Sequence, residues 1–443
     1  IENYVSLKNI LLEANYKFYS ETDSEVMVNF IDYICNLNPD YSWEQQVRLA
    51  LSRIHGTYGI ILYHVDYPEK VIVARHSSPL VLGMLEDKLF ISSDYYSFIE
   101  KTRDIINLQD GEIGIINRTT LKLEVRNMDT NTKVEPNILK LDMKLDSIEK
   151  SVFEHFMLKE ILKQSESIQD SMRGRINSEG NVKLGGLEVL KDNQTLIDKL
   201  SKATRIILCA CGTSLHAAMV GKYIIEELAD IPVEVEQASE FRYRKKSITC
   251  NTVVIGISQS GETADTIEAV KSMVENSLCL GICNTVACSL SQITEGGIYL
   301  HVGPEIGVAS TKAFTGQLSI LYMLAIRLAQ TKNIRDSLSK TIGRQLLEIP
   351  KIYQTITDKI KTQIKMLAKT YKFASNFLFL GRGYNYPIAL EAALKLKEIS
   401  YIHAEGYSAA EMKHGPIALI DKMMPVVVIA MKDSIYPKVL TNV

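Results

Sequence analysis

A hydroxyl-rich turn joins two apolar segments in the middle of the chain. The run Val253 to Ile257 ends in Ser-Gln-Ser-Gly-Glu-Thr at 258–263, and a helix-like stretch follows over 264–274. The first-turn N–H groups of a helix lack internal partners and the helix dipole is positive there, so this junction suits a phosphate. Gly261 lets the backbone approach such a ligand closely. The hydroxyl donors are those of Ser258, Ser260 and Thr263.

Helix capping is the alternative explanation of these hydroxyls. Ser260 or Thr263 alone would be explained as an N-cap residue. One cap does not need three hydroxyls and a glycine, so the sequence favours phosphate binding.

Two further loops have the same character. Gly212-Thr213-Ser214 follows the apolar run 205–210, and the segment 303–312 follows the run 298–301. Ser310 or Thr311 in the second loop would also serve as a simple helix cap. Because ligands of parallel sheets bind beyond the carboxyl ends of the strands, we expect the loops to share one anion pocket.

A charged stripe lies near the end of the chain. Pro387 is placed to open a helix, and Glu391, Lys395 and Glu398 then share one face at i, i+4 and i+7, whereas Lys397 suits the solvated face. One interpretation is a solvated row of ion pairs. The other is a carboxylate and an ammonium that converge on a sugar phosphate, where one moves a proton between adjacent carbons. The local sequence does not decide between them.

His414 lies in the turn Lys-His-Gly-Pro at 413–416. A histidine on a loop near the strand ends can act as acid and base near neutral pH. The alternative is a structural turn residue. His403, beside Tyr401, suits packing better.

Composition excludes several classes of function. The 443 residues contain 50 Lys and Arg against 52 Asp and Glu, so no overall field attracts nucleic acid or an anionic membrane. Seven cysteines without C-x-x-C spacing argue against zinc and a disulfide framework, and favour a reducing compartment, by default the cytoplasm. No apolar run is long enough to span a membrane. The chain starts at Ile1 without a signal peptide or initiator Met, so we expect it to begin partway into a protein.

Residues 1–127 are predicted to form an antiparallel α+β domain with two helices, Tyr4 to Ala14 and Glu25 to Cys35. A linker is expected over 128–190, with one helix around Ser147 to Gln164. The strands of the domain at 1–127 are predicted from short β-branched or aromatic runs separated by turn residues, at 59–64, 71–74, 80–83, 89–92, 112–116 and 121–125.

From Arg205 onward, apolar strands alternate with helices. This βαβ pattern predicts a doubly wound parallel sheet over 191–345. A second copy over 346–443 follows at an offset of 171, because Gly381-Arg382-Gly383 aligns with Ala210-Cys211-Gly212. This copy is expected to be cut short.

The loops at 211–214, 258–263, 305–312 and 413–416 resemble the isomerase half of the glutamine:fructose-6-phosphate aminotransferase family, which consists of two sugar isomerase (SIS) domains. Three segments of the first domain, at 1–4, 20–26 and 75–80, resemble the later part of that family's glutaminase domain, which has an N-terminal-nucleophile αββα fold. The resemblance spans essentially the whole chain.

The resemblance implies a role for each candidate residue. Glu398 would move the proton between C1 and C2 with the help of Lys395 and Glu391, and Asp23 would bind the α-amino group of glutamine. His414 would open the sugar ring from a neighbouring subunit, which implies a homodimer or homotetramer. The sugar phosphate would be held by Thr213, Ser214, Ser258, Gln259, Ser260 and Thr263, with Val308 and Ser310 beside the sugar.

The implied activity is glutamine-dependent conversion of fructose 6-phosphate into glucosamine 6-phosphate, the first step of hexosamine and UDP-N-acetylglucosamine synthesis, without metal or organic cofactor. The chain as written is expected to lack the family's nucleophilic cysteine and its Schiff-base lysine. A sugar-phosphate isomerase and a non-catalytic sugar-phosphate-binding SIS protein are the alternatives.

Overall fold

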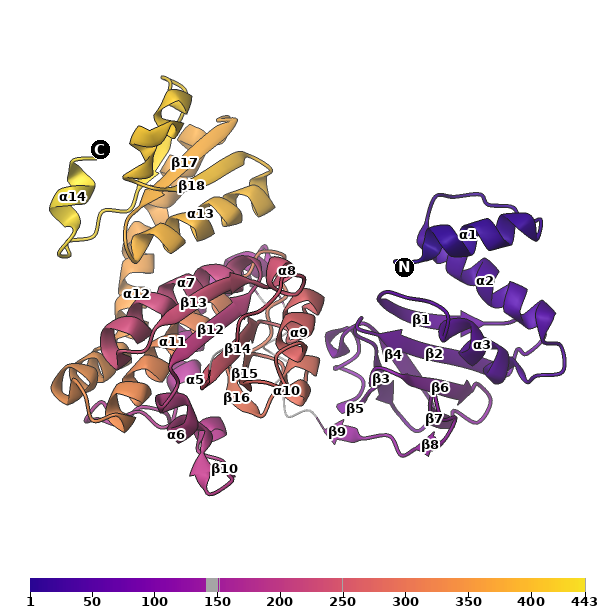
Figure 1. The fold of residues 1–443 in the computed structure, drawn as a ribbon. Helices are drawn as coiled ribbons and strands as arrows, with labels where there is room; N and C mark the ends of the chain where they lie inside the picture. Colours follow the sequence, from indigo (N-terminus) through magenta and orange to yellow (C-terminus); the bar gives the residue numbers. More distant parts are fainter. Residues whose placement is uncertain (141–149, 151, 249, 443) are drawn as a thin grey trace. The chain divides into compact units, whose positions relative to one another are not determined.

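The computed structural model describes residues 1–140, 150, 152–248 and 250–442, and it divides into two compact units, Ile1–Glu149 and Lys150–Val443 (Figure 1). The boundary falls within the segment that was expected to be a linker. Each unit has its own hydrophobic core.

Three helices form one layer of the first unit. Two were predicted, and the third begins with a capping box in which Ser42 and Gln45 satisfy each other's backbone N–H groups. That S-x-x-Q signal is visible in the sequence, so the third helix was predictable. The helices are α1 (Tyr4–Glu13), α2 (Asp23–Leu37) and α3 (Trp43–Leu51).

Two antiparallel sheets complete the first unit. Along β2, Ile72 and Ala74 pack with the helices while Val73 packs toward the second sheet, so both faces of this strand are buried. The predicted antiparallel α+β arrangement is confirmed, although β5, β8 and β9 were not predicted. The larger sheet has the order β1 (Tyr58–Tyr63), β2 (Lys70–His76), β6 (Glu112–Asn117), β7 (Leu123–Asn127), β8 (Lys133–Val134), and the smaller has β4 (Leu89–Ser92), β3 (Val81–Met84), β5 (Asp104–Asn107), β9 (Ile138–Lys140).

Residues 150–201 lead into the second unit. The single helix expected around Ser147 to Gln164 is instead a pair of shorter helices, and residues 147–149 and 151 lie outside the described part of the chain. Ile168, Met172 and Leu187 join the core of the second unit, so this segment is structural there. The elements are α4 (Phe156–Leu162), α5 (Gln164–Met172), β10 (Leu190–Lys191), β11 (Gln194–Thr195) and α6 (Leu196–Ser201).

A five-stranded parallel sheet forms the centre of the second unit, as predicted. Its strands are in the order β13 (Val233–Gln237), β12 (Arg205–Ala210), β14 (Thr252–Ser258), β15 (Leu278–Cys283) and β16 (Gly296–Tyr299). All seven residues of β14 are buried, because helices cover both faces. One face packs against α7 (Gly212–Ala229) and α11 (Lys312–Thr331), and the other against α8 (Ala238–Phe241), α9 (Ala264–Lys271) and α10 (Ser289–Ile293).

The 36-residue helix α12 (Asp336–Tyr371) leads to a second parallel sheet, in the order β18 (His403–Ser408), β17 (Asn376–Gly381), β19 (Val426–Val428). Both ends of β17 lie 171 positions after those of β12, and β18 and β19 flank β17 as β13 and β14 flank β12. The predicted internal repeat is therefore confirmed. The accompanying helices are α13 (Asn385–Ser400) and α14 (Tyr436–Leu440).

Within the described ranges, none of these helices combines the length and the apolar character that crossing a bilayer requires.

Candidate functional site

The turn at 258–263 connects the end of β14 to the start of α9. The hydroxyl oxygen of Ser258 accepts a hydrogen bond from the Gly261 N–H at 3.0 Å and lies 2.9 Å from the Thr263 hydroxyl. The Ser260 hydroxyl accepts from the Glu262 N–H at 3.1 Å. Thr263 occupies the N-cap position of α9, but its hydroxyl contacts Ser258 instead of a first-turn N–H. Capping therefore does not account for the three hydroxyls, which gather on one turn.

Gly261 gives this turn its shape. Its φ of +72° lies in the left-handed region, and a Cβ at this position would overlap the Cys288 side chain. The turn needs a glycine for both reasons.

The loop after β12 turns toward the second sheet. The Thr213 hydroxyl donates to Glu391 Oε1 at 3.0 Å and accepts from Lys395 Nζ at 2.9 Å. The buried Ser214 hydroxyl accepts from the Gln317 amide at 2.9 Å. These bonds join the N-terminal turn of α7 to α13 and α11.

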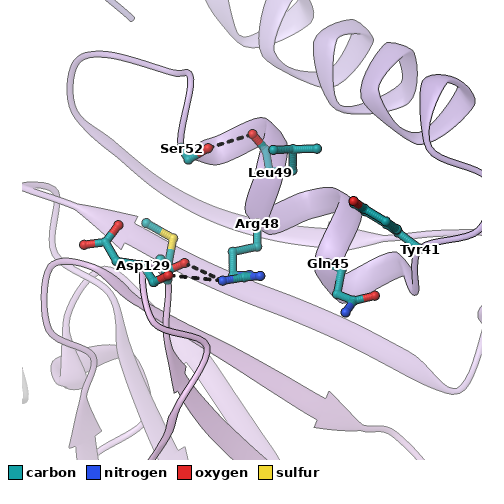
Figure 2. Close-up of a pocket in the computed structure, with 7 residues that line it drawn as sticks. Tyr41, Gln45, Arg48, Leu49, Ser52 and Asp129 are labelled. Carbon is teal, nitrogen blue, oxygen red and sulfur yellow. Dashed lines mark hydrogen bonds between the residues drawn. The ribbon is translucent and has the colours of Figure 1, made fainter.

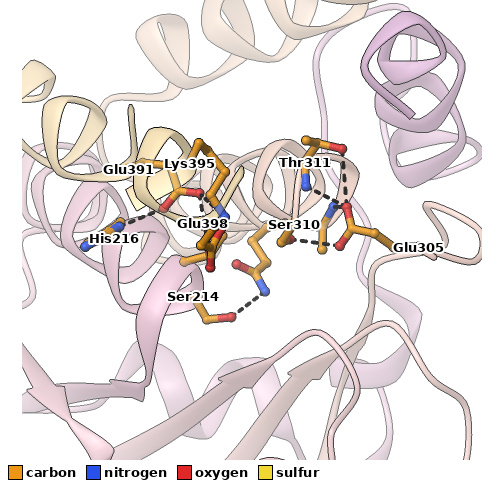
Figure 3. Close-up of polar contacts among 11 residues, drawn as sticks. Ser214, His216, Glu305, Ser310, Thr311, Glu391, Lys395 and Glu398 are labelled. Atoms are coloured by element: carbon orange, nitrogen blue, oxygen red, sulfur yellow. Dashed lines mark hydrogen bonds and ion pairs between the residues drawn. The ribbon is translucent and has the colours of Figure 1, made fainter. Parts of the chain in front are cut away.

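The charged stripe on α13 forms a connected cluster (Figure 3). Lys395 Nζ lies 2.7 Å from Glu398 Oε2 and 3.3 Å from Glu391 Oε1, and His216 Nδ1 lies 2.7 Å from Glu391 Oε2. The side chain of Glu391 is only 7% exposed, whereas that of Glu398 is 33% exposed. A purely solvated row of ion pairs does not fit a carboxylate buried this deeply.

Lys397 shows what a solvated pair on the same helix looks like. Its side chain is 43% exposed and its Nζ lies 3.9 Å from Glu405 Oε1. The prediction that Lys397 faces solvent is confirmed. The cluster of Glu391, Lys395 and Glu398 thus occupies a different face of α13.

The cluster has a buried end and an accessible end. Glu391 contacts Thr213, His216 and Lys395, which fix its carboxylate. Lys395 then lies between that carboxylate and Glu398. An accessible carboxylate held beside an ammonium is suited to take a proton from a bound substrate and return it.

The loop at 303–312 is organised by a carboxylate. Glu305 accepts from the Ser310 hydroxyl at 2.8 Å, the Thr311 N–H at 2.6 Å and the Ala313 N–H at 3.3 Å (Figure 3). Glu305 therefore caps α11, and the alternative interpretation, in which the Ser310 or Thr311 side chain supplies the cap, is wrong. A carboxylate suits this position because the helix N-terminus is electropositive.

A second buried carboxylate supports this loop. Glu160 of α4, 3% exposed, accepts from the N–H groups of Ile306 at 2.6 Å and Gly307 at 3.0 Å. Val308, which follows, is 91% exposed, so the loop presents it outward.

Two predicted site residues lie away from this cluster. His414 is exposed in a short 3₁₀ turn, Glu411–His414, that precedes Gly415. Asp23 begins α2 in the first unit, and its side chain is 43% exposed.

Sequence reasoning missed His216, Glu305 and Gln317. His216 follows Thr213 by three residues on α7, so the shared face was readable. Its partner Glu391 is 175 positions away, and no local pattern connects the two. Glu305 was visible as an acid seven residues before a helix, but its capping role depends on how the loop folds back.

A separate pocket of about 540 Å³ lies in the first unit (Figure 2). Arg48 of α3 donates across it to the carbonyl oxygens of Met128 at 3.0 Å and Asp129 at 3.4 Å. The guanidinium thus holds the turn after β7, and the pocket contains none of the predicted site residues. Its lining consists of Tyr41, Gln45, Arg48, Leu49, Ser52, Met128 and Asp129.

No group of three or more His, Cys, Asp or Glu side chains suited to a metal ion occurs among the residues that the structure describes.

Comparison with known proteins places both parallel sheets in one family of domains. The SIS domain model matches residues 199–327 and 372–442. The C-terminal domain of glucosamine-fructose-6-phosphate aminotransferase from Francisella tularensis matches with a TM-score of 0.62 and 39% identity, over 66% of this chain and 81% of that one.

Full-length relatives extend the likeness to the first unit. Glutamine–fructose-6-phosphate aminotransferase (isomerizing) from Bacteroides thetaiotaomicron is 50% identical and that from Chlorobaculum tepidum is 48% identical. Each match covers all of this chain and 71% of the relative. The chain therefore belongs to the glutamine–fructose-6-phosphate aminotransferase (isomerizing) family.

Proposed function

We propose that the protein transfers the amide nitrogen of glutamine to fructose 6-phosphate and isomerises the product to glucosamine 6-phosphate. Relatives that carry this activity in their names are up to 50% identical over the whole chain. The observation that carries the proposal is the Glu391–Lys395–Glu398 cluster, held against Thr213 of the first sheet.

Glu398 is the proton carrier in this proposal. Isomerisation moves a hydrogen between C1 and C2, which requires one base that takes a proton at one carbon and returns it at the other. Glu398 is the more exposed carboxylate of the cluster, and Lys395 lies 2.7 Å from it. The ammonium stabilises the carboxylate and the negative charge that develops on the substrate.

Glu391 is a positioning residue in this scheme. Its buried carboxylate, fixed by Thr213 and His216, holds Lys395 in place. Thr213 therefore serves the charged cluster as well as the sugar that the family resemblance assigns to it.

The sugar phosphate is held, in this proposal, by the turn at 258–263. The hydroxyls of Ser258, Ser260 and Thr263 gather there at the start of α9, and Gln259 is half-buried beside them. Backbone N–H groups at a helix start and hydroxyl donors are the groups that bind phosphate oxygens. Ser214, Val308 and Ser310 complete the substrate contacts.

The first unit is assigned to glutamine. Residues 1–127 would be the later part of a glutaminase domain, 128–190 a linker, and 191–345 and 346–443 the two SIS domains. Asp23 would bind the α-amino group of glutamine, and its carboxylate, 43% exposed at the start of α2, is accessible to that group.

The proposal extends to assembly and location. The exposure of His414 supports its reaching a second copy of the chain, in a homodimer or homotetramer. All seven cysteines are free thiols, which supports a reducing compartment such as the cytoplasm.

The Glu398→Gln variant tests the proposal. In the full-length protein that carries the nucleophilic cysteine and the Schiff-base lysine, it should lower glucosamine 6-phosphate formation by about 10²–10⁴-fold, because it removes the base. The dissociation constant for fructose 6-phosphate, measured by calorimetry, should change less than about threefold, since the phosphate contacts remain. Glu405→Gln is the matched control, because Glu405 is a solvated carboxylate near α13, and it should be unaffected.

Two results would contradict the proposal. Full activity of Glu398→Gln would remove the assigned base. Conversion of fructose 6-phosphate to glucose 6-phosphate, with no dependence on a nitrogen donor, would identify a plain isomerase.

A further inference from the structure

Two cysteines lie directly behind the turn at 258–263. Cys283 ends β15 and Cys288 precedes α10, and each residue is 2% exposed. Their Sγ atoms lie 3.3 Å apart, and both are free thiols. A disulfide requires about 2.05 Å between the sulfurs, so a shift of roughly 1.3 Å would join them.

The segment 284–290, which follows Cys283 and contains Cys288, is hydrogen-bonded to the phosphate turn at both ends. The N–H of Asn284 donates to the Gln259 carbonyl at 2.9 Å, and that of Leu290 donates to the Gly261 carbonyl at 3.0 Å. Ala287 between them has a φ of +57°, which costs a residue with a side chain about 1 kcal/mol or more. The segment is therefore both coupled to the turn and held in an unfavourable conformation.

A side-chain bond adds to this coupling. The Glu262 carboxylate accepts from the Ser289 N–H at 2.8 Å and from its hydroxyl at 2.7 Å. The side chain of Cys288, next to Ser289, also fills the space that a Cβ atom on Gly261 would need. A movement of Cys288 would thus reach the turn through contact and through hydrogen bonds.

A small cavity lies beside the pair. A cavity of about 190 Å³ is lined by Cys283, together with Ser291, Thr294 and Tyr299. The cavity is large enough to hold a molecule such as hydrogen peroxide beside Cys283. Bulky reagents would be excluded, because both thiols are buried.

The pKa values of the two thiols shift in opposite directions. Contact with Cys283 lowers the pKa of the Cys288 thiol, whereas the same contact and burial raise the pKa of Cys283. Burial alone raises the pKa of Cys209 and Cys279 to about 12. Of the two, Cys288 is therefore the thiol that loses its proton more readily, and the thiolate is the form that reacts in disulfide formation.

We propose that Cys283 and Cys288 form a reversible intramolecular disulfide that weakens phosphate binding by the 258–263 turn. The S–S bond forms as the two S–H bonds break. Hydrogen peroxide accepts the two electrons and two protons and leaves as two water molecules. The effect on phosphate binding rests on the function proposed above, whereas the disulfide itself does not.

Intact-mass measurement tests the disulfide. The exposed Cys250 is first replaced by Ser, so that it forms no disulfide between molecules. Hydrogen peroxide should then lower the mass by about 2 Da, and dithiothreitol should restore it. Cys283→Ser and Cys288→Ser should each abolish the change, whereas Cys279→Ser, a buried thiol on the same strand, should keep it. The proposal is overturned if peroxide still lowers the mass of the Cys288→Ser variant by about 2 Da. It is also overturned if peroxide leaves the mass unchanged in the Cys250→Ser protein that retains Cys283 and Cys288.

Calorimetry with fructose 6-phosphate tests the coupling. The oxidised protein should bind at least about tenfold more weakly than the reduced protein. Cys288→Ser should bind equally well before and after peroxide. Equal affinity of the disulfide and dithiol forms would refute the coupling. Failure of the reduced protein to bind would instead refute the proposed function, while the mass measurement still decides whether the disulfide forms.

Discussion

The two parallel sheets of the second unit repeat one backbone arrangement. The helices that follow their equivalent strands differ, because one carries apolar residues and the other carries charged residues at matching positions. Helices α7 and α13 follow equivalent strands, β12 and β17, at an offset of 171. By that offset, Val220 and Ile224 of α7 correspond to Glu391 and Lys395 of α13. The first two are each 4% exposed in the apolar core, while the second two form the charged cluster. The same backbone arrangement thus carries apolar packing in the first copy and charges in the second.

The loops that follow equivalent strands of the two sheets also differ, and here the first copy carries the polar groups. The first copy has the turn at 258–263 with three hydroxyls at the end of β14, whereas the equivalent residues after β19, at 430–435, read Ala-Met-Lys-Asp-Ser-Ile and contain one hydroxyl. The first copy supplies groups that bind an anion, and the second supplies groups that move a proton. Thr213 joins them, because it belongs to the first copy and contacts both Glu391 and Lys395 of the second.

Paired substitutions at the equivalent helix positions should separate the two roles most strongly. Lys395→Met should lower product formation by about 10²-fold or more, because Glu398 loses its charge partner. Ile224→Ala at the matching position of α7 should instead cost about 2–5 kcal/mol of unfolding free energy, since it leaves a cavity in the core. Activity assays and urea unfolding of both variants check this.

The comparison would be contradicted if either variant showed the effect that is expected of the other. If Lys395→Met mainly unfolds the protein, or if Ile224→Ala mainly abolishes catalysis in a fully folded protein, the two helices do not divide packing and chemistry as described.

Gly261→Ala is expected to give the next largest effect. The substitution costs about 1–3 kcal/mol from the left-handed φ and more from overlap with Cys288. Cys288→Ala should recover part of the loss in the double variant, because it removes the overlapping sulfur but not the backbone strain. Unfolding free energies of the four proteins in the cycle measure this coupling, and strict additivity would show that the contact is unimportant.

Thr263→Val should have the smallest effect. It keeps the shape of the side chain and removes one hydroxyl from the phosphate turn, so the dissociation constant for fructose 6-phosphate should rise by about tenfold. Binding of unphosphorylated fructose serves as the comparison. An equal loss for both sugars would mean that Thr263 does not contact the phosphate.

Much of this frame was predictable from sequence because its signals are local. The apolar runs at 205–210 and 253–257 mark buried parallel strands, and the repeated glycine turn marks the second copy. The i, i+4 and i+7 spacing likewise placed Glu391, Lys395 and Glu398 on one face. The capping box at Ser42 was equally local and was overlooked.

The features that the sequence did not predict depend on how the chain folds back to bring residues together. The two interpretations of the charged stripe on α13 are decided by the contacts of Glu391 with Thr213 and His216. Both partners lie more than 170 positions from Glu391 in the sequence. The cap of α11 by Glu305 requires the loop to fold back on itself, which propensity does not encode. The pairing of Cys283 with Cys288 depends on the turn that brings them together.

A crystal structure with fructose 6-phosphate tests the central claim most directly. The account predicts the phosphate within about 3 Å of the hydroxyl and N–H groups of residues 258–263. It also predicts C1 or C2 within about 3.5 Å of the Glu398 carboxylate. A sugar phosphate bound at that turn with its C1 and C2 away from Glu398, or bound elsewhere in the second unit, would contradict the division of labour between the two copies.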